Sequence, residues 1–387
     1  MDAPRVKGAL ALVVGAGGVA AALGYLWTIV AGRLLTPAEY AGFSAAAAII
    51  YFAVTACLPL MQSVAYFVVR GDAALERRLL TITAIAGAAV VIAGAIAASL
   101  WLAVSLVTTA ALNVRRGVQL GEQRFDAYAW NIAAEAVLRI VFIVAFLQAH
   151  RSASSAIASY AASTLIATLL PGRIRRGGAA VPGFARYLAP MLAYTAIFAA
   201  FQNLDVLVAR HAFAAADAGR YGAASFLARG AGMLVMPFAA FALPRLAQAA
   251  DAADLRRRFA AICLAYAALA ALAVAILGGA SAWIVRTLFG TPYAAAAPLL
   301  FPLGGAIALS GLVYLVCQLP ASGNSFRFLA AYAAGLVLDA ALIAVWHGSA
   351  LQLARSVAAA NALTLLLVLP FARRLPSPRT PAAACSG

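Results

Sequence analysis

The sequence predicts an all-α integral membrane protein of about 12 transmembrane helices, arranged as two parallel repeats of six. Hydrophobic residues make up 65% of the chain and charged residues 10%, whereas soluble domains have roughly a quarter charged residues. The apolar residues form runs long enough to cross a bilayer, which takes about 20 residues. A sequence repeat in the same orientation divides these runs into two equal sets.

The repeat has two markers in each half of the chain. Asp72-Ala-Ala-Leu-Glu-Arg-Arg78 returns as Asp251-Ala-Ala-Asp-Leu-Arg-Arg-Arg258, a shift of 251 − 72 = 179. Tyr40-Ala-Gly-Phe-Ser44 returns as Tyr221-Gly-Ala-Ala-Ser225, a shift of 221 − 40 = 181. Duplicated polytopic proteins with a site where the halves meet are commonly transporters, so transport is the first functional hypothesis.

Each half holds six apolar runs of spanning length. Arg5 and Lys7 precede the first run, which is longer than a signal-peptide core, so we expect it to remain as the first helix. The third and fourth spans must both fit between Leu79 and Asn113, with a turn near 97–99. The predicted spans are 10–31, 41–68, 79–96, 98–114, 127–148 and 153–171, followed by 187–213, 221–246, 258–278, 294–317, 327–346 and 351–371.

The net charge of +16 comes from arginines whose positions indicate the orientation of the chain in the membrane. The arginines lie in short clusters between apolar runs, and basic residues accumulate in cytoplasmic loops, so a nucleic-acid partner is not indicated. With 12 spans and an inside N-terminus, every basic cluster, Arg115 and Arg116 included, lies in an inside loop. The outside ends hold only Arg33, Arg151, Arg210, Arg220, Arg286 and Arg355. We therefore expect a multi-pass protein of the bacterial inner (plasma) membrane with both termini in the cytoplasm.

These runs predict four segments. Residues 1–176 form an N-terminal six-helix bundle, and residues 184–374 form the C-terminal six-helix bundle. Residues 177–183 are a cytoplasmic linker, and residues 375–387 are a disordered cytoplasmic tail.

No motif indicates catalysis, a metal or a cofactor. Cys57, Cys263, Cys317 and Cys385 are scattered and lack the spacing of a zinc or redox site. The histidines lie apart in the sequence, at the outer ends of predicted spans.

Ionisable side chains inside spans are the candidate functional residues, because each costs roughly 2.5–3.5 kcal/mol at the bilayer centre. Asp205 and Arg229 each lie 12 residues from Asp217, which we place in the middle of the loop joining their spans. In such a hairpin they lie at similar depth, as an ion pair or as two poles of a polar cavity. An ion pair that only holds the hairpin together is the alternative.

A second set of ionisable residues follows the repeat. Glu135 and Arg139 share a helix face, since they are four residues apart. Asp339 stands seven residues after Tyr332, as Glu135 stands seven after Tyr128, and Ile343 replaces Arg139. Glu135, Arg139 and Asp339 are therefore ion-coupling candidates, with Asp339 preferred because it has no nearby basic residue. A carboxylate that caps buried polar groups is the alternative.

Candidate substrate-binding residues are arginines and amides near the same spans. Arg33, Arg210 and Arg220 lie near outer span ends, where guanidinium groups suit phosphate oxygens and also snorkel to the interface. Gln62, Gln202, Asn203 and Asn131 add hydrogen-bonding capacity for sugar hydroxyls or for helix packing.

Several segments resemble a known family. Gly32-Arg-Leu-Leu-Thr-Pro-Ala-Glu-Tyr-Ala-Gly-Phe-Ser44, Asn203-Leu-Asp205, Ala218-Gly-Arg-Tyr-Gly-Ala-Ala-Ser225 and Phe241-Ala-Leu-Pro-Arg-Leu246 resemble Wzx-like polysaccharide/O-antigen unit flippases. These belong to the multidrug/oligosaccharidyl-lipid/polysaccharide (MOP) exporter superfamily.

The resemblance implies two MATE/MOP-like bundles around a cavity that opens alternately to the two membrane faces. It also implies that Arg33, Asp205, Arg210 and Arg229 face this cavity, and that the cargo is a polyprenyl-diphosphate-linked oligosaccharide.

The favoured function is therefore a flippase that translocates this lipid-linked glycan by alternating access for cell-surface polysaccharide biosynthesis. Its expected partners are the lipid-linked glycan, the lipid bilayer and a glycan polymerase or other export proteins. A cation-coupled drug exporter of the same fold is the first alternative, for which an acidic cavity is expected. A membrane glycan polymerase or ligase is the second, but it needs catalytic groups on a sizeable outer loop.

Overall fold

The computed structural model describes residues 3–72, 74–97, 99–172, 174, 180–232, 251–322 and 326–373. Throughout these residues the regular structure is helical, and the chain forms two compact units, Met1–Ala199 and Ala200–Gly387. The predicted tail 375–387 and the resembling segment 241–246 lie outside the described residues, as does much of the predicted linker 177–183. The two compact units divide between Ala199 and Ala200, within a helix and not at the predicted linker. The linker 177–183 as the boundary between two bundles therefore stays a prediction.

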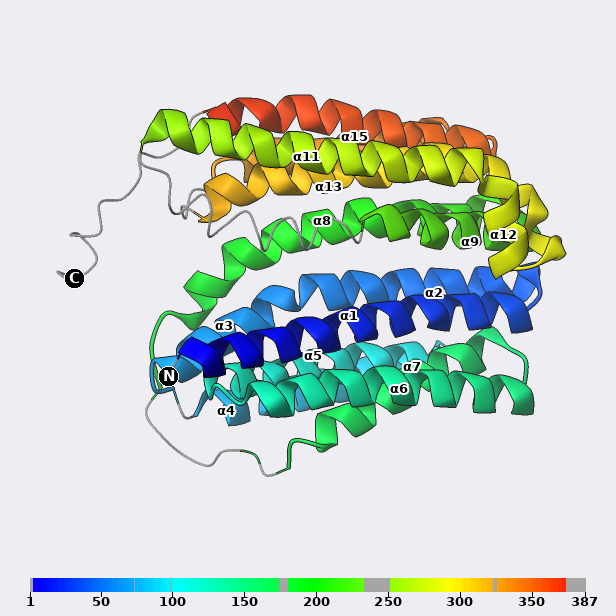
Figure 1. Cartoon of the computed structure of the whole chain (residues 1–387). Coiled ribbons are helices and arrows are strands. Elements are labelled where there is room, and N and C mark those ends of the chain that lie inside the picture. The colour runs from blue at the N-terminus through cyan, green and yellow to red at the C-terminus, as the bar shows by residue number, and fades with distance from the viewer. Residues whose placement is uncertain are drawn as a thin grey trace. The chain divides into compact units, whose positions relative to one another are not determined.

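The first unit contains seven complete helices in the described residues. They are α1 (Ala3–Leu34), α2 (Pro37–Ala56), α3 (Leu58–Val69), α4 (Leu75–Ile96), α5 (Leu100–Gly121), α6 (Phe125–Ala149) and α7 (Ala153–Leu169). Helix α8 (Phe184–Ala212) runs across the boundary into the second unit (Figure 1). Helices α2 and α3 form the second predicted span, broken at Cys57 because Pro59 has no N–H to donate to the carbonyl of Thr55.

The third and fourth predicted spans do fit into the short segment available. Helix α4 ends at Ile96 and α5 begins at Leu100, and the backbone N–H of Ser99 donates to the carbonyl of Gly94 over 2.7 Å. A Cβ at Gly94 would lie 2.4 Å from that of Ala103, so the missing side chain lets the two helices approach closely. This tight turn gives the first half an even number of spans, as a parallel repeat requires.

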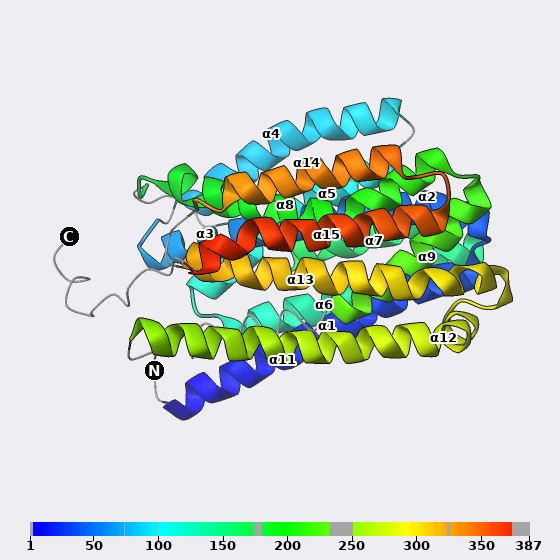
Figure 2. The ribbon, with the colours of Figure 1, turned by 90° about the horizontal axis from the view of Figure 1, so that it is seen from above.

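The second unit repeats the order of the first. After α8 come α9 (Ala215–Gly232), α11 (Ala252–Gly279), α12 (Ser281–Leu288), the 3₁₀ helix η1 (Thr291–Leu299), α13 (Leu300–Ser322), α14 (Leu329–Val345) and α15 (Ala350–Arg373). Figure 2 shows α14, α15, α13 and α11 side by side in that order, and α13 packs on both α15 and α11.

An insertion lengthens the second copy of the repeat. The starts of α4 and α11 differ by 252 − 75 = 177 residues, and those of α6 and α14 by 329 − 125 = 204. Helix α12 and η1, which lie between α11 and α13, account for most of the increase.

The prediction of an all-α membrane protein is confirmed. Eight helical stretches in the described residues are long and apolar enough to cross a membrane, and α7 and α14 are shorter apolar helices. The predicted spans 98–114 and 221–246 correspond to α5 and to α9, whose described part ends at Gly232. The predicted sidedness and the cytoplasmic termini remain predictions.

Replacing Gly117 by alanine tests the packing of α5 on α3. A Cβ there would lie 2.6 Å from the carbonyl oxygen of Met61 and 2.7 Å from Cβ of Val64, and such overpacking costs about 1–3 kcal/mol. We expect Gly117→Ala to lower the thermal unfolding temperature of the detergent-purified protein, followed by tryptophan fluorescence. Gly18→Ala, whose Cβ would meet nothing within 4 Å, is the control, and equal unfolding temperatures would contradict the packing described.

Candidate functional site

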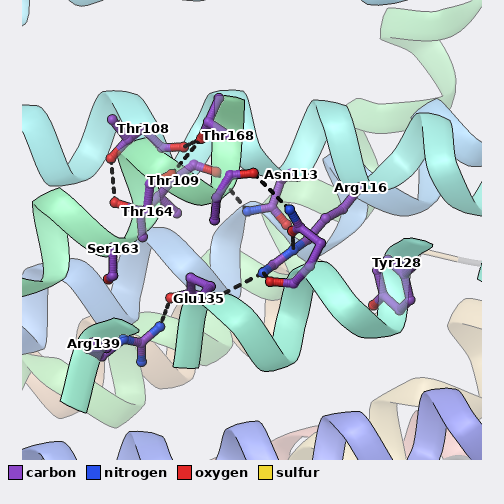
Figure 3. A network of polar contacts seen from close by, with 12 residues as sticks. Thr108, Thr109, Asn113, Arg116, Tyr128, Glu135, Arg139, Ser163, Thr164 and Thr168 are labelled. Atoms are coloured by element: carbon purple, nitrogen blue, oxygen red, sulfur yellow. Dashed lines mark hydrogen bonds and ion pairs between the residues drawn. The ribbon is translucent and has the colours of Figure 1, made fainter. Parts of the chain in front are cut away.

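Glu135 is the centre of a charged cluster inside the first unit. The side chain lies on α6 and is 5% exposed. One carboxylate oxygen is paired with Arg139, one helical turn further on, and the other lies 3.1 Å from Nη2 of Arg116 on α5 (Figure 3). The carboxylate is therefore neutralised by two guanidinium groups, which leaves the cluster with a net positive charge.

Hydrogen bonds extend this cluster across α5, α6 and α7. Nε of Arg116 donates to Oδ1 of Asn131 over 2.9 Å, and Nδ2 of Asn131 donates to the carbonyl of Ala167 over 2.7 Å. The guanidinium of Arg139 lies 4.6 Å from the ring centroid of Tyr160, and a further hydroxyl contact of 2.7 Å joins Thr108 to Thr164 (Figure 3). These contacts tie the three helices together through polar groups.

The structure confirms the predicted pair of Glu135 and Arg139 and corrects the placement of Arg116. Arg116 does not lie in a loop but inside α5, where it contacts Glu135. The sequence feature that could have indicated this contact is the short connection 122–124 between α5 and α6. Because these two helices form a hairpin, residues shortly before the connection and residues shortly after it lie at similar depth.

Asp205 is the centre of a polar cluster in the second unit. The side chain lies on α8 and is 4% exposed. The hydroxyl of Tyr221 donates to its Oδ2 over 3.0 Å and that of Ser225 over 3.2 Å, both from α9. The charge of Arg229 also acts on Asp205, and the Arg229 guanidinium lies 4.6 Å from the ring centroid of Phe226.

The predicted register of the α8–α9 hairpin was wrong. The chain turns at residues 213–214, and Asp217 lies in the first turn of α9, where its carboxylate is 2.8 Å from Nη1 of Arg220. An acidic residue is favoured in the first turn because it interacts with the helix dipole. The shifted turn places Tyr221 and Ser225, which the sequence analysis did not select as site residues, against Asp205.

Asp339 lies near Asp205 within the second unit. It is 1% exposed, and neither of its carboxylate oxygens has a hydrogen-bond partner among the described residues. The two carboxylates interact electrostatically. A buried carboxylate of this kind is stabilised by a proton or by a bound cation, and hard cations prefer oxygen ligands such as carboxylates.

Asp339 and Glu135 occupy the same position in equivalent helices. Each stands ten residues after the start of its helix, since 135 − 125 = 339 − 329 = 10. In the second unit Ile343 stands in place of Arg139, since 343 − 139 = 339 − 135 = 204. The first unit thus supplies its own cations, whereas the second does not supply one to Asp339 among the described residues.

The other predicted site residues lie outside these two clusters. Nε2 of Gln202 donates to the hydroxyl of Ser310 on α13, and Asn203 is buried. Gln62 is exposed on α3, and Arg33 and Arg210 are exposed in the last turns of α1 and α8. Their predicted role in substrate binding stays a prediction.

No family model and no curated protein matches the chain, but solved structures of similar fold do. The inward-facing form of a multidrug resistance MATE family transporter of the MOP superfamily matches with a TM-score of 0.69 at 12% identity, over 90% of this chain and 93% of that one. The eukaryotic MATE transporter AtDTX14 matches with a TM-score of 0.55 at 13% identity, over 96% of each chain.

A MOP superfamily transporter from Pyrococcus furiosus Vc1, whose binding pocket is described as having reverse polarity, matches with a TM-score of 0.51 at 11% identity, over 95% of each chain. The chain therefore has the same fold as these MATE transporters.

Glu135→Gln tests the electrostatic role of the first cluster. Removing one partner from a buried ion pair typically costs about 3–5 kcal/mol because it leaves a charge uncompensated. We therefore expect a marked loss of thermal stability in detergent. Asp217→Asn, which removes an exposed partner of Arg220 with 59% side-chain exposure, is the control, and exposed pairs contribute at most about 1 kcal/mol. Equal stability of the two variants would show that Glu135 is not a structural tie.

Proposed function

We propose that this protein is a secondary transporter that works by alternating access and couples to a proton or a small cation at Asp339 and Asp205. The observation that carries this proposal is the buried Asp339 carboxylate, which has no hydrogen-bond partner among the described residues. Leaving a buried charge uncompensated is costly. A proton or cation that binds to Asp339 and is released again would therefore change the relative stability of the two conformations of the transporter. The MATE fold of the chain supports the transport class.

The cargo we propose is a polyprenyl-diphosphate-linked oligosaccharide, moved to the outer leaflet of the bacterial inner membrane for polysaccharide biosynthesis. The sequence resemblance to Wzx-like flippases supports this cargo. Guanidinium groups suit the oxygens of a diphosphate, and Arg33 and Arg210 expose such groups at helix ends. We expect Arg229, which is only partly buried, to contribute a third. A glycan polymerase or another export protein would receive the cargo.

A cation-coupled drug exporter is the second candidate. Two observations favour it: solved structures of similar fold include multidrug resistance transporters, and Asp205 and Asp339 make the second-unit cluster acidic. A cationic drug would interact favourably with such a site.

The leaflet distribution of the lipid-linked glycan tests the cargo. In cells lacking the protein, we expect the glycan to stay on the inner leaflet, protected from a membrane-impermeant glycosidase. Wild-type protein would restore access to the enzyme, Arg210→Ala and Arg229→Ala would not, and Arg355→Ala, at an exposed position on α15, would serve as the control. A normal distribution without the protein, accompanied by drug sensitivity, would favour the exporter.

Asp339→Asn tests coupling independently of the cargo. Asparagine has nearly the same shape but neither binds a proton at the same site nor carries a negative charge. We expect proteoliposomes with Asp339→Asn to lose the cation flux that wild-type protein shows under an imposed sodium or proton gradient. Asp217→Asn is the matched control because it changes an exposed carboxylate. Unchanged flux in Asp339→Asn would remove Asp339 from the coupling site.

A further inference from the structure

A groove of about 400 Å³ lies on the first unit, and Glu135, Arg116 and Arg139 are not among its lining residues. Helices α4 and α7 both pack on α5, and the groove takes its lining from all three helices and from the segment that follows α7. The lining residues are Arg77, Leu80, Thr81 and Ala84 from α4, Arg115 from α5, Thr168 and Leu169 from α7, and Gly172 and Ile174 after it.

Among the described residues, the charges around the groove leave one cation in excess. Nη2 of Arg78 lies 2.8 Å from Oδ2 of Asp72, and Nη1 of Arg115 lies 3.1 Å from Oε1 of Glu76. These two carboxylates thus offset the charges of Arg78 and Arg115. Arg77 is exposed and has no ion-pair partner among the described residues, so the groove carries a net positive charge that an anion would balance.

Arg115 adds a second guanidinium to the groove. The residue is 4% exposed, and its Nη2 donates to the carbonyl of Gly172 over 2.6 Å. Its Nε has no hydrogen-bond acceptor among the described residues. A buried guanidinium with an unused donor is costly, and an acceptor brought by a ligand would lower this cost.

The rest of the groove suits an acyl chain. Leu80, Ala84, Leu169 and Ile174 give it apolar walls. The lining residue Leu169 is 68% exposed, and Ile85, next to the lining residue Ala84 in the chain, is 70% exposed. This is the exposure expected of side chains that face lipid in a membrane helix. A ligand that fits both the arginines and the apolar walls of the groove has an anionic head and a hydrocarbon tail.

We propose that this groove binds an anionic phospholipid, whose phosphate pairs with Arg77 and Arg115 and whose acyl chain lies along Leu80, Ala84 and Leu169. Phosphate oxygens form strong charge-assisted hydrogen bonds with guanidinium groups, and basic pockets between transmembrane helices bind anionic headgroups. The lipid bridges α4 and α7, which are both packed on α5, and so stabilises the first unit. The proposal is independent of the cargo.

The repeat provides a matched control for Arg77. Arg256 occupies the same place in the second copy, since 77 − 72 = 256 − 251 = 5, and it is exposed with no ion-pair partner among the described residues. Removing either arginine changes the net charge by the same amount, but Arg256 does not line the groove.

The test measures binding of phosphatidylglycerol to the full-length protein in nanodiscs of phosphatidylcholine, by native mass spectrometry and by the shift in thermal unfolding temperature. We expect Arg77→Ala to weaken phosphatidylglycerol binding at least tenfold and to abolish the thermal shift. Arg77→Lys would keep part of both effects, and Arg256→Ala would change neither.

Three outcomes would overturn the proposal. Equal losses in Arg77→Ala and Arg256→Ala would mean that the lipid responds only to total charge. Competition by millimolar inorganic phosphate would mean that the groove binds a soluble anion. Unchanged binding in Arg77→Ala, with the helix content intact by circular dichroism, would remove the site altogether.

Discussion

The cost of burying a charge inside a membrane-embedded helix bundle is the constraint on which the rest of this structure depends. The two halves of the chain differ in how they offset this cost at one equivalent helix position. Glu135 has Arg116 and Arg139 within the protein, whereas Asp339 has no hydrogen-bond partner in the described part of the chain. The first half therefore compensates its charge within the protein, and we propose that the second takes a proton or a cation from outside.

In the first unit the buried carboxylates are neutralised by arginines of the same unit, so these charged groups hold its helices together. Arg116 joins α5 to α6, and Asn131 continues the link to a carbonyl of α7. The pair of Arg115 and Glu76 similarly joins α5 to α4. Such pairs add little net stability compared with an apolar core, but they are costly to break. They favour one arrangement of α4, α5, α6 and α7, which suits a unit that moves as a rigid body.

The fold was largely predictable from the sequence, but the charged site was predictable only in part. Apolar length gives the spans, and the turn between Ile96 and Leu100 follows from the parallel repeat. Helix ends were less visible, because alanine-rich segments carry few capping signals; Asp217 therefore looked like a loop residue although it begins α9. Arg116 was missed because charge counting assigns arginines to loops, whereas a long side chain within a helix can reach a carboxylate on the next one.

The divergence of the repeat also gives the two clusters opposite signs. Arg116, Arg139 and Glu135 together carry 2 − 1 = +1, whereas Arg229, Asp205 and Asp339 carry 1 − 2 = −1 when ionised. A site that neutralises its carboxylate with two arginines repels a cation, which is why the proposed coupling site lies in the second unit. The first unit retains a positive charge that would attract an anionic group. The replacement of Arg139 by Ile343 at the equivalent helix position is one of the differences that give the two clusters net charges of opposite sign.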